Sequence, residues 1–429
     1  MSTNLYETQA EVISTALPEM FVGARNKIFN KVVKPAKMEM IGERAFRIPA
    51  LTSPGGRGRM IDINGGTWGR GTYQSSLVMT APTYAFSMPF ELPKLADDIG
   101  SNSKLSPAMN AFKKLTGAGV VEMIDLINRC FHATYPGKLA TASAHSVVGG
   151  VSQYTVDSVA NLRIKQYVLV YPTGVTSITA RNSGTACQIT AIDAANLYVT
   201  LDTSVASAAA TDCLWVEGAN LIDAVNPIGM STPYVFHNAA TTGTINGVNV
   251  ANQAEMRSNQ VAVTAIPTHL DIMRLMTALR RRSGSDEWGQ KKLFGAIAPE
   301  TQAQFMSSVQ SIAMFDLAKV KNTLSEASDF MVPQDTAVFG GVRWVIDDNQ
   351  DPTRAEFYSL SDWVRPQYPG GDLQMRKDRN GNIFYNIAAS DGAPTATTWF
   401  AMYMSTNAVC INPRNGGYIS GIPAVTWTI

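Results

Sequence analysis

A run of apolar residues at helical spacing, within residues 106–132, constrains the fold of this chain more than any other feature. Ser106 is a good N-cap residue, and Pro107 suits the first helical turn, where its missing N–H is no loss. Gly137 and the proline before it mark the end of the pattern. The spacing predicts one helix about 40 Å long. Its apolar positions are Met109, Phe112, Leu115, Val120, Met123, Ile124, Ile127 and Phe131.

Two glycines, Gly117 and Gly119, stand inside this predicted helix. Each costs about 1 kcal/mol of helix stability relative to alanine. We therefore expect either a bend in the helix or a close crossing with another element at this point.

Residues 54–71, "PGGRGRMIDINGGTWGRG", contain seven glycines and three arginines. They do not match the phosphate-binding loop, which needs a lysine and a hydroxyl residue at the start of a helix. "AFRIPALTS" precedes them, and "SLVMTAPTYAFSMPFELP" follows, where Tyr84, Phe86 and Met88 alternate with smaller residues. Alternation on both sides of a glycine-rich centre predicts a long β-hairpin.

Residues 21–44 hold six basic residues against two acidic ones, with short apolar pairs between them. This pattern indicates an arm that lies on another surface. A solvated amphipathic surface segment explains the pattern equally well.

From about residue 140 the chain becomes rich in small and β-branched residues. The short apolar runs "QYVLVY", "CQITAI", "LYVTLD" and "CLWVEG" follow at even intervals, which predicts a small β-barrel or sandwich over residues 147–222. Helices are predicted again from "PTHLDIMRLMTALRRRSG", where Thr268 and Asp271 form a capping box, and from the segment after Pro299. A strand-rich C-terminal part completes an α+β protein.

The composition favours a large folded protein, since the 429 residues are 45% hydrophobic and 16% charged. A net charge of +1 provides no field that would draw the whole chain onto nucleic acid, so we expect any DNA contact to be local and weak. The N-terminus shows no secretion signal, and no apolar run is long enough to span a membrane. The four cysteines stand far apart, as in a reduced cytosolic chain.

No catalytic, cofactor or metal site is expected. None of the four histidines belongs to an HExxH motif, and no cysteine stands beside a histidine. "DDNQD", residues 347–351, is interpreted as a solvated loop, with a cation site as the alternative. The arginines of 280–282 complement the dipole of a helix C-terminus, with a phosphate contact as the alternative.

The arm, the hairpin, "FELPKLADDIGSNSKLSP" and the long helix together resemble the front half of a tailed-bacteriophage major capsid protein of the Hong Kong 97-like fold. "LFGAIAPETQAQFMSSV" is similar to the axial-domain strand, proline and helix of that family. "FGGVRWVIDDNQDPTRAEFYSLSDW" resembles its strand, acidic turn and return strand. The resemblance covers most of the chain outside 147–222.

The resemblance implies an α+β Hong Kong 97-like capsid fold with an inserted small β-barrel or sandwich domain. It implies these parts: an N-terminal arm 1–43, an extended loop 44–92, a peripheral domain with the spine helix 93–146, the inserted β domain 147–222, an axial domain 223–340, peripheral-domain strands 341–405 and a C-terminal segment 406–429 that returns to the axial domain.

The resemblance also implies a function: hexamers and pentamers of the chain tile an icosahedral shell around double-stranded DNA. Contacts between subunits are expected from the extended loop, through Arg57, Arg59, Trp68 and Arg70, and from the arm, through Arg25, Lys27, Lys31 and Lys34. Simple solubility of an exposed tip is the alternative for the loop arginines. The implied partners are a scaffolding protein, a portal and a decoration protein, and the implied location is the virion, after assembly in the host cytoplasm.

Two other functions fit parts of the sequence. In the first, the β domain binds carbohydrate or another surface through exposed aromatic residues. The candidates are Tyr154, Tyr167, Tyr171, Tyr198 and Trp215. In the second, the chain forms an encapsulin-like compartment, which shares the capsid fold but packages enzymes.

Overall fold

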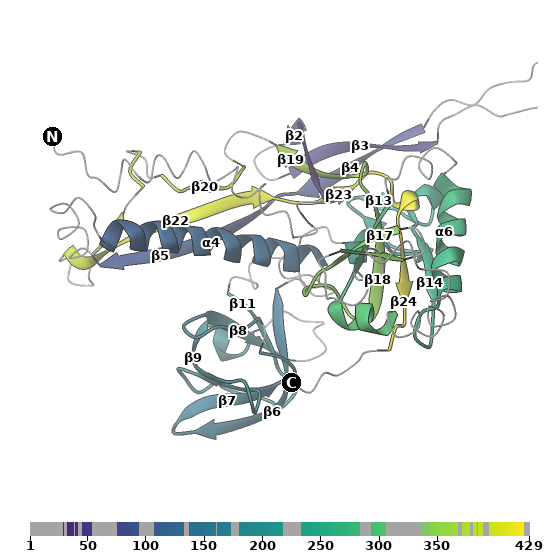
Figure 1. The fold of residues 1–429 in the computed structure, drawn as a ribbon. Helices are drawn as coiled ribbons and strands as arrows, with labels where there is room; N and C mark the ends of the chain where they lie inside the picture. The colour runs from purple at the N-terminus through teal and green to yellow at the C-terminus, as the bar shows by residue number, and fades with distance from the viewer. Residues whose placement is uncertain are drawn as a thin grey trace, which may run out of the picture. The chain divides into compact units, whose positions relative to one another are not determined.

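The chain divides into two compact units, one of Met1–Asn128 with Pro233–Ala424 and one of Arg129–Thr232 with Val425–Ile429. Figure 1 shows their helices and strands. This computed structural model describes residues 29, 32–37, 39–41, 45–53, 75–93, 107–132, 137–159, 161–172, 180–217, 233–283, 293–305, 336–339, 342–367, 371–377, 381–383, 385–388 and 394–423.

In the first unit a long helix lies on a long strand pair. The helix is α4 (Pro107–His132), and the strands are β5 (Tyr84–Pro93) and β22 (Pro394–Thr406). The two strands pair antiparallel from Tyr84↔Thr406 to Pro93↔Thr397. The other edge of β22 carries the short strands β20 (Gln374–Met375) and β21 (Tyr385–Ala388).

The helix approaches this sheet most closely at Gly119. A Cβ atom there would lie 2.2 Å from Cζ of Phe90 and 2.7 Å from Cε of Met402, so no larger residue fits without displacing them. Beneath it the rings of Phe90 and Phe400 stack with centroids 4.9 Å apart. Gly117 has no such neighbour within 4 Å. The close crossing expected from the sequence is therefore confirmed, and it belongs to Gly119.

A six-stranded sheet forms the second core of this unit, in the order β14-β24-β18-β15-β17-β16. The pairs β14–β24 and β15–β17 are parallel, and the other pairs are antiparallel. Trp344 is fully buried, and its ring lies over Gly295 of the neighbouring strand, where a Cβ would be 2.3 Å away. The strands are β14 (Asn259–Ala262), β15 (Leu293–Ile297), β16 (Thr336–Phe339), β17 (Val342–Ile346), β18 (Arg354–Ser359) and β24 (Gly417–Ser420).

Helix α6 (His269–Ser283) buries one face in the core of this sheet. Its N-terminus is closed by the expected capping box. The Asp271 carboxylate accepts hydrogen bonds from the backbone N of Thr268, at 2.9 Å, and from its Oγ1, at 2.8 Å. The buried positions recur at helical spacing and pack against the sheet. They are Ile272, Leu275, Met276 and Leu279.

Smaller sheets complete the first unit. They have the orders β2-β3-β4, β1-β19-β23 and β12-β13. The short helical segments of this unit are α5 (Pro233–Phe236), η3 (Ala254–Met256) and η5 (Pro413–Asn415), and residues 299–305 are also helical. The strands are β1 (Lys34–Lys37), β2 (Glu39–Ile41), β3 (Ala45–Ser53), β4 (Ser75–Pro82), β12 (Thr244–Ile245), β13 (Val248–Asn249), β19 (Trp363–Gln367) and β23 (Val409–Cys410).

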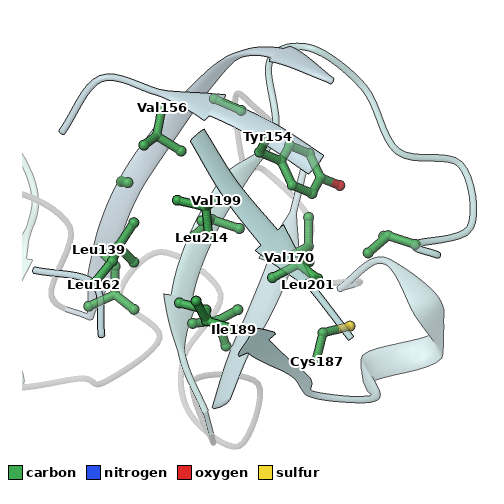
Figure 2. Close-up of a cluster of buried hydrophobic side chains, with 14 residues drawn as sticks. Leu139, Tyr154, Val156, Leu162, Val170, Cys187, Ile189, Val199, Leu201 and Leu214 are labelled. Atoms are coloured by element: carbon green, nitrogen blue, oxygen red, sulfur yellow. The ribbon is translucent and has the colours of Figure 1, made fainter. Parts of the chain in front are cut away.

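The second unit contains a closed barrel with the strand order β10-β7-β6-β11-β8-β9. Figure 2 shows its interior, where Tyr154, Val170, Ile189 and Leu214 are fully or almost fully buried. The strands are β6 (Lys138–Val148), β7 (Val151–Val156), β8 (Tyr167–Tyr171), β9 (Cys187–Asp193), β10 (Tyr198–Leu201) and β11 (Cys213–Val216), with η1 (Asn182–Gly184) between β8 and β9.

One buried carboxylate braces the end of the barrel. Asp212 is fully buried and receives Arg181 Nη2 at 2.8 Å and the backbone N of Ala209 at 2.8 Å. A charge without such partners would be costly to bury. The pKa of the Tyr154 hydroxyl is raised above its ordinary value. The larger cause is burial, and the second is the negative charge of the nearby Asp212.

The structure is a mixed helix-and-strand protein, as the sequence indicates. The long helix predicted within 106–132 is α4, and the four short apolar runs are β8, β9, β10 and β11. Two details differ from expectation. The stretch after the glycine-rich segment forms two strands, β4 and β5, that belong to different sheets. The barrel begins with β6 at Lys138, earlier than residue 147, because small residues such as Ala140 and Ala142 already face its core.

The two glycines of α4 provide a matched test of the close crossing. Gly119→Ala is expected to lower the stability of the first unit by about 1–3 kcal/mol, because the added methyl overlaps Phe90 and Met402. Gly117→Ala is expected to raise it by up to about 1 kcal/mol, through helix propensity alone. Thermal and denaturant unfolding of the two variants measures both changes. Equal effects at the two positions would contradict the assigned packing.

Candidate functional site

The glycine- and arginine-rich stretch is the first candidate. Arg57, Arg59, Trp68 and Arg70 lie outside the described residues, so their expected contacts remain predictions. The strands on either side of the stretch are described. β3 and β4 pair antiparallel from Ala45↔Pro82 to Ser53↔Ser75, and the residues between them therefore leave and re-enter at neighbouring strand ends.

The β3–β4 ribbon has one buried and one exposed face. The buried face consists of Phe46, Ile48, Met79 and Ala81. The exposed face includes Arg47 and Val78, whose side chain is 56% exposed. Two hydrogen bonds fix the base of the ribbon: Thr80 N donates to Asn246 O at 3.0 Å, and Asn407 Nδ2 donates to Pro82 O at 2.6 Å. The ribbon is thus a rigid base for the loop.

The N-terminal arm is the second candidate. Arg25, Lys27 and Lys31 lie outside the described residues. Lys34 begins β1, which pairs in parallel with β19 of the same chain, and its side chain is exposed. Before it the apolar residues Phe29, Val32 and Val33 are buried. This part of the arm is therefore anchored by apolar burial and carries a basic side chain on its outer surface.

A buried amide, which the sequence analysis did not single out, fixes the arm to the long helix. Asn128 of α4 is fully buried. Its Oδ1 accepts from the backbone N of Phe29 at 3.1 Å, and its Nδ2 donates to Asp347 Oδ2 at 2.7 Å. One side chain thus joins the arm, the helix and the acidic turn after β17. In the sequence, this role is indicated only by the presence of an asparagine on an otherwise apolar face of the helix.

The carboxylates of the acidic turn accept hydrogen bonds from residues of the same turn. Asp347 Oδ1 accepts from Asn349 N at 3.0 Å, and Asp351 Oδ1 accepts from the N and Oγ1 of Thr353 at 2.8 and 2.6 Å. Asp347 is buried rather than solvated, so the solvated-loop interpretation is wrong for this residue. No group of three or more His, Cys, Asp and Glu side chains within the described residues is arranged to hold a metal ion.

A buried cluster of Glu356, Arg354 and His237 lies at the six-stranded sheet. The sequence analysis did not predict this cluster. Glu356 accepts from Arg354 Nη2 at 2.8 Å and lies 2.5 Å from His237 Nδ1. Arg354 also donates to His237 O at 3.2 Å and lies over the Tyr418 ring, 4.1 Å from its centroid. Gly416 leaves room for the imidazole, since a Cβ there would lie 2.4 Å from Nε2. These contacts satisfy buried charges, and they join β18 to β24 and to His237, the residue after α5.

The four cysteine thiols and the hydroxyl of Ser152 are enclosed in the packing. All four cysteines are buried as free thiols, and burial raises the pKa of Cys130 to about 12. His145 Nε2 lies 3.1 Å from Ser152 Oγ in the barrel, but that hydroxyl is fully buried and accepts from Val205 N at 2.9 Å. Such groups stabilise the fold and do not present a reactive atom.

The barrel aromatics are mostly internal. Tyr154, Tyr171 and Trp215 are buried, and only Tyr167 and Tyr198 of the five candidates are exposed, by 49% and 37%. Stacking on sugars requires exposed rings, so the aromatic cluster expected of a carbohydrate-binding surface is absent from these five positions.

No helix within the described ranges has the length and apolar character needed to cross a bilayer.

Comparison with known proteins gives structural matches only. No family model and no curated protein matches the sequence. The chain is similar to a structure described as the Cyanophage A-1(L) capsid asymmetric unit, with a TM-score of 0.44 and 12% identity, covering 91% of this chain and 90% of that chain. It is also similar to the asymmetric unit of the bacteriophage PhiM1 mature capsid, with a TM-score of 0.41 and 8% identity, covering 93% and 88%.

A further match is a virus-like particle from Pyrococcus furiosus, with a TM-score of 0.35 and 10% identity, covering 96% of this chain and 99% of that chain. Phage capsid proteins, the class that the sequence resembles, are thus among the solved structures to which the chain is similar.

The buried amide of α4 provides a test of how the arm is held. Asn128→Ala is expected to lower stability by about 2–3 kcal/mol, because it removes the donor to Oδ2 of the buried Asp347 and the acceptor for the backbone N of Phe29. Limited proteolysis should also cut the arm faster. Asn252→Ala, at an exposed asparagine, is the control and should change neither measurement. Equal protease sensitivity of the two variants would contradict this role of Asn128.

Proposed function

We propose that this chain is the major capsid protein of a tailed bacteriophage. In this proposal it has the Hong Kong 97-like fold with an inserted β domain. Its copies form hexamers and pentamers that close an icosahedral shell around double-stranded DNA. The chain acts by binding copies of itself, and it performs no turnover.

One observation carries the proposal: long elements lie side by side and keep apolar surface outside the cores. Helix α4 has 26 residues and lies on the ten-residue strand β5. Val121 of this helix is 58% exposed, and Val78 of the β3–β4 ribbon is 56% exposed. A protein that tiles a shell presents apolar surface of this kind to its neighbours.

The extended loop and the arm are the proposed contacts between subunits. The rigid β3–β4 base projects residues 54–71, and Arg57, Arg59 and Arg70 reach a neighbouring subunit with Trp68 as an apolar anchor. Glycine gives this segment backbone freedom to rearrange as a shell matures. Arg25, Lys27, Lys31 and the exposed Lys34 supply a second, basic contact.

The inserted β domain braces or decorates the shell. Its closed barrel is a complete core of its own, so it requires no other part of the chain to bury its strands. The burial of three of its five aromatic residues disfavours the carbohydrate-binding alternative. A scaffolding protein, a portal and a decoration protein remain proposed partners, in a particle assembled in the host cytoplasm.

Deletion of residues 55–71 tests the assigned role of the loop. The expected product is a folded subunit, with unchanged circular dichroism and unfolding temperature, because the buried face of the β3–β4 ribbon is retained. This subunit should not form closed shells when examined by negative-stain microscopy and sedimentation. Asn252→Ala, at an exposed asparagine outside the barrel, is the control and should assemble normally. Closed particles of normal size from the deletion variant would refute the role.

The contents of purified particles separate the capsid from the encapsulin-like alternative. We expect particles from infected cells to hold nuclease-protected double-stranded DNA, because the near-neutral chain encloses a genome that a motor delivers rather than one that it attracts. Extraction followed by gel electrophoresis and mass spectrometry measures this directly. Particles filled with a single enzyme and free of DNA would instead indicate a compartment.

A further inference from the structure

The second half of strand β6 has a paired strand on one side only. β11 closes the barrel against residues 138–141 of β6. From Ala144 to Val148 the strand pairs with β7 in a regular antiparallel register. Within the described part of the chain, no strand pairs with the other side of this segment. We call the unpaired side of Ala144–Val148 the free β6 edge.

The hairpin turn shows which backbone groups face this edge. Gly149 and Gly150 join β6 to β7, and both have positive φ, 62° and 86°, as in a type I′ turn. The residues that flank such a turn exchange both backbone hydrogen bonds, and successive residues then point alternately toward and away from the partner strand. The N–H and C=O of His145 and Val147 therefore point away from β7. Among the described residues, no backbone hydrogen bond reaches these groups.

Neither charge nor proline protects the free β6 edge. Residues 139–156, which include the whole hairpin turn, contain no Asp, Glu, Lys, Arg or Pro. Proteins usually block an exposed edge with a lysine, a proline or a bulge, because its unpaired N–H and C=O groups can bind another strand. The register shift between β6 and β7 lies between Ala142 and Ala144, before the free edge begins. Val147 and Val148 are 57% and 53% exposed, so apolar side chains accompany the unpaired backbone.

A second copy of the same edge has the chemistry to cover it. An antiparallel pair of identical strands is self-complementary, because a two-fold axis brings the N–H groups of one edge opposite the C=O groups of the other. Like charges that face each other across such a pair would weaken it. The absence of Asp, Glu, Lys and Arg from residues 139–156 removes this repulsion. The edge is therefore suited to pairing with itself.

We propose that the free β6 edges of two copies of this chain pair antiparallel across a two-fold axis, so that two inserted β domains share one sheet. Full overlap of Ala144–Val148 with itself places Ser146 opposite the same residue of the second copy. It also places His145 opposite Val147, and each such pair exchanges both of its backbone hydrogen bonds. The contact rests on the proposed function, which brings copies of the chain together, and it assigns residues to the bracing role of the β domain.

A cysteine at Ser146 tests the register. In the proposed pair the two Ser146 residues form a non-hydrogen-bonded pair, with Cα atoms about 4.5 Å apart, a separation that a disulfide spans. All four native cysteines are buried, so they do not compete with the new thiol. When full-length Ser146→Cys is assembled with a mild oxidant, non-reducing gels should show a dimer as the main species. Ile164→Cys, at a barrel residue that is 58% exposed and lies outside β6, is the matched control and should remain monomeric.

A charge at Val147 tests the contact by repulsion. Val147→Lys brings the lysines of two copies to diagonal positions of the shared sheet, and the yield of closed particles should fall about tenfold. The unfolding temperature should not change, because the side chain is exposed. Val147→Thr keeps an uncharged, β-branched residue and should assemble normally. Ile164→Lys adds the same charge away from the edge and should also assemble normally. Sedimentation and negative-stain microscopy measure the yield.

The outcomes separate this contact from the capsid function. Wild-type particles with neither Ser146→Cys dimers nor an effect of Val147→Lys would overturn the edge pairing and leave the proposed function standing. Ser146→Cys dimers from a chain that forms no particle would support the pairing and count against the shell. Equal dimer formation by Ile164→Cys would overturn the pairing, because the link would then report chance collisions. So would a link from Ser146→Cys to a different polypeptide in particles from infected cells, because a separate protein would then cover the edge.

Discussion

The contact between α4 and the β5–β22 pair is the constraint on which the first unit depends. It requires a helix backbone to reach a sheet surface at Gly119, where Phe90 and Met402 leave no room for a side chain. The same helix carries Asn128, which holds the arm through Phe29 and the acidic turn through Asp347. Displacing the helix would therefore disturb the arm, which is a proposed subunit contact, together with the acidic turn and the β5–β22 pair.

Each of the two units contains a buried carboxylate that is held by an arginine of the same unit. Asp212 is held by Arg181 in the barrel, and Glu356 is held by Arg354 and His237 in the six-stranded sheet. In both places buried carboxylates are matched by donors, as their desolvation requires.

Much of the secondary structure followed from local patterns. The α4 helix, the capping box of Thr268 and Asp271, and the barrel strands β8–β11 were predicted because apolar spacing and end residues act over a few neighbours. The separation of β4 from β5 was not predicted, because the sequence is continuous through both, and only their partners, β3 and β22, place them in different sheets. The subunit contacts assigned to Arg57 and Trp68 remain predictions.

The sequence by itself determined the periodicity of the helices and strands, the absence of a strong net charge, and the glycine-rich composition of the proposed loop. Only the tertiary structure decided which of two glycines meets a sheet, which asparagine holds the arm, and which carboxylates are buried against arginines. Most of the residues that these contacts bring together are far apart in the chain. Local spacing carries no information about such pairs, because they are brought together by packing of whole elements.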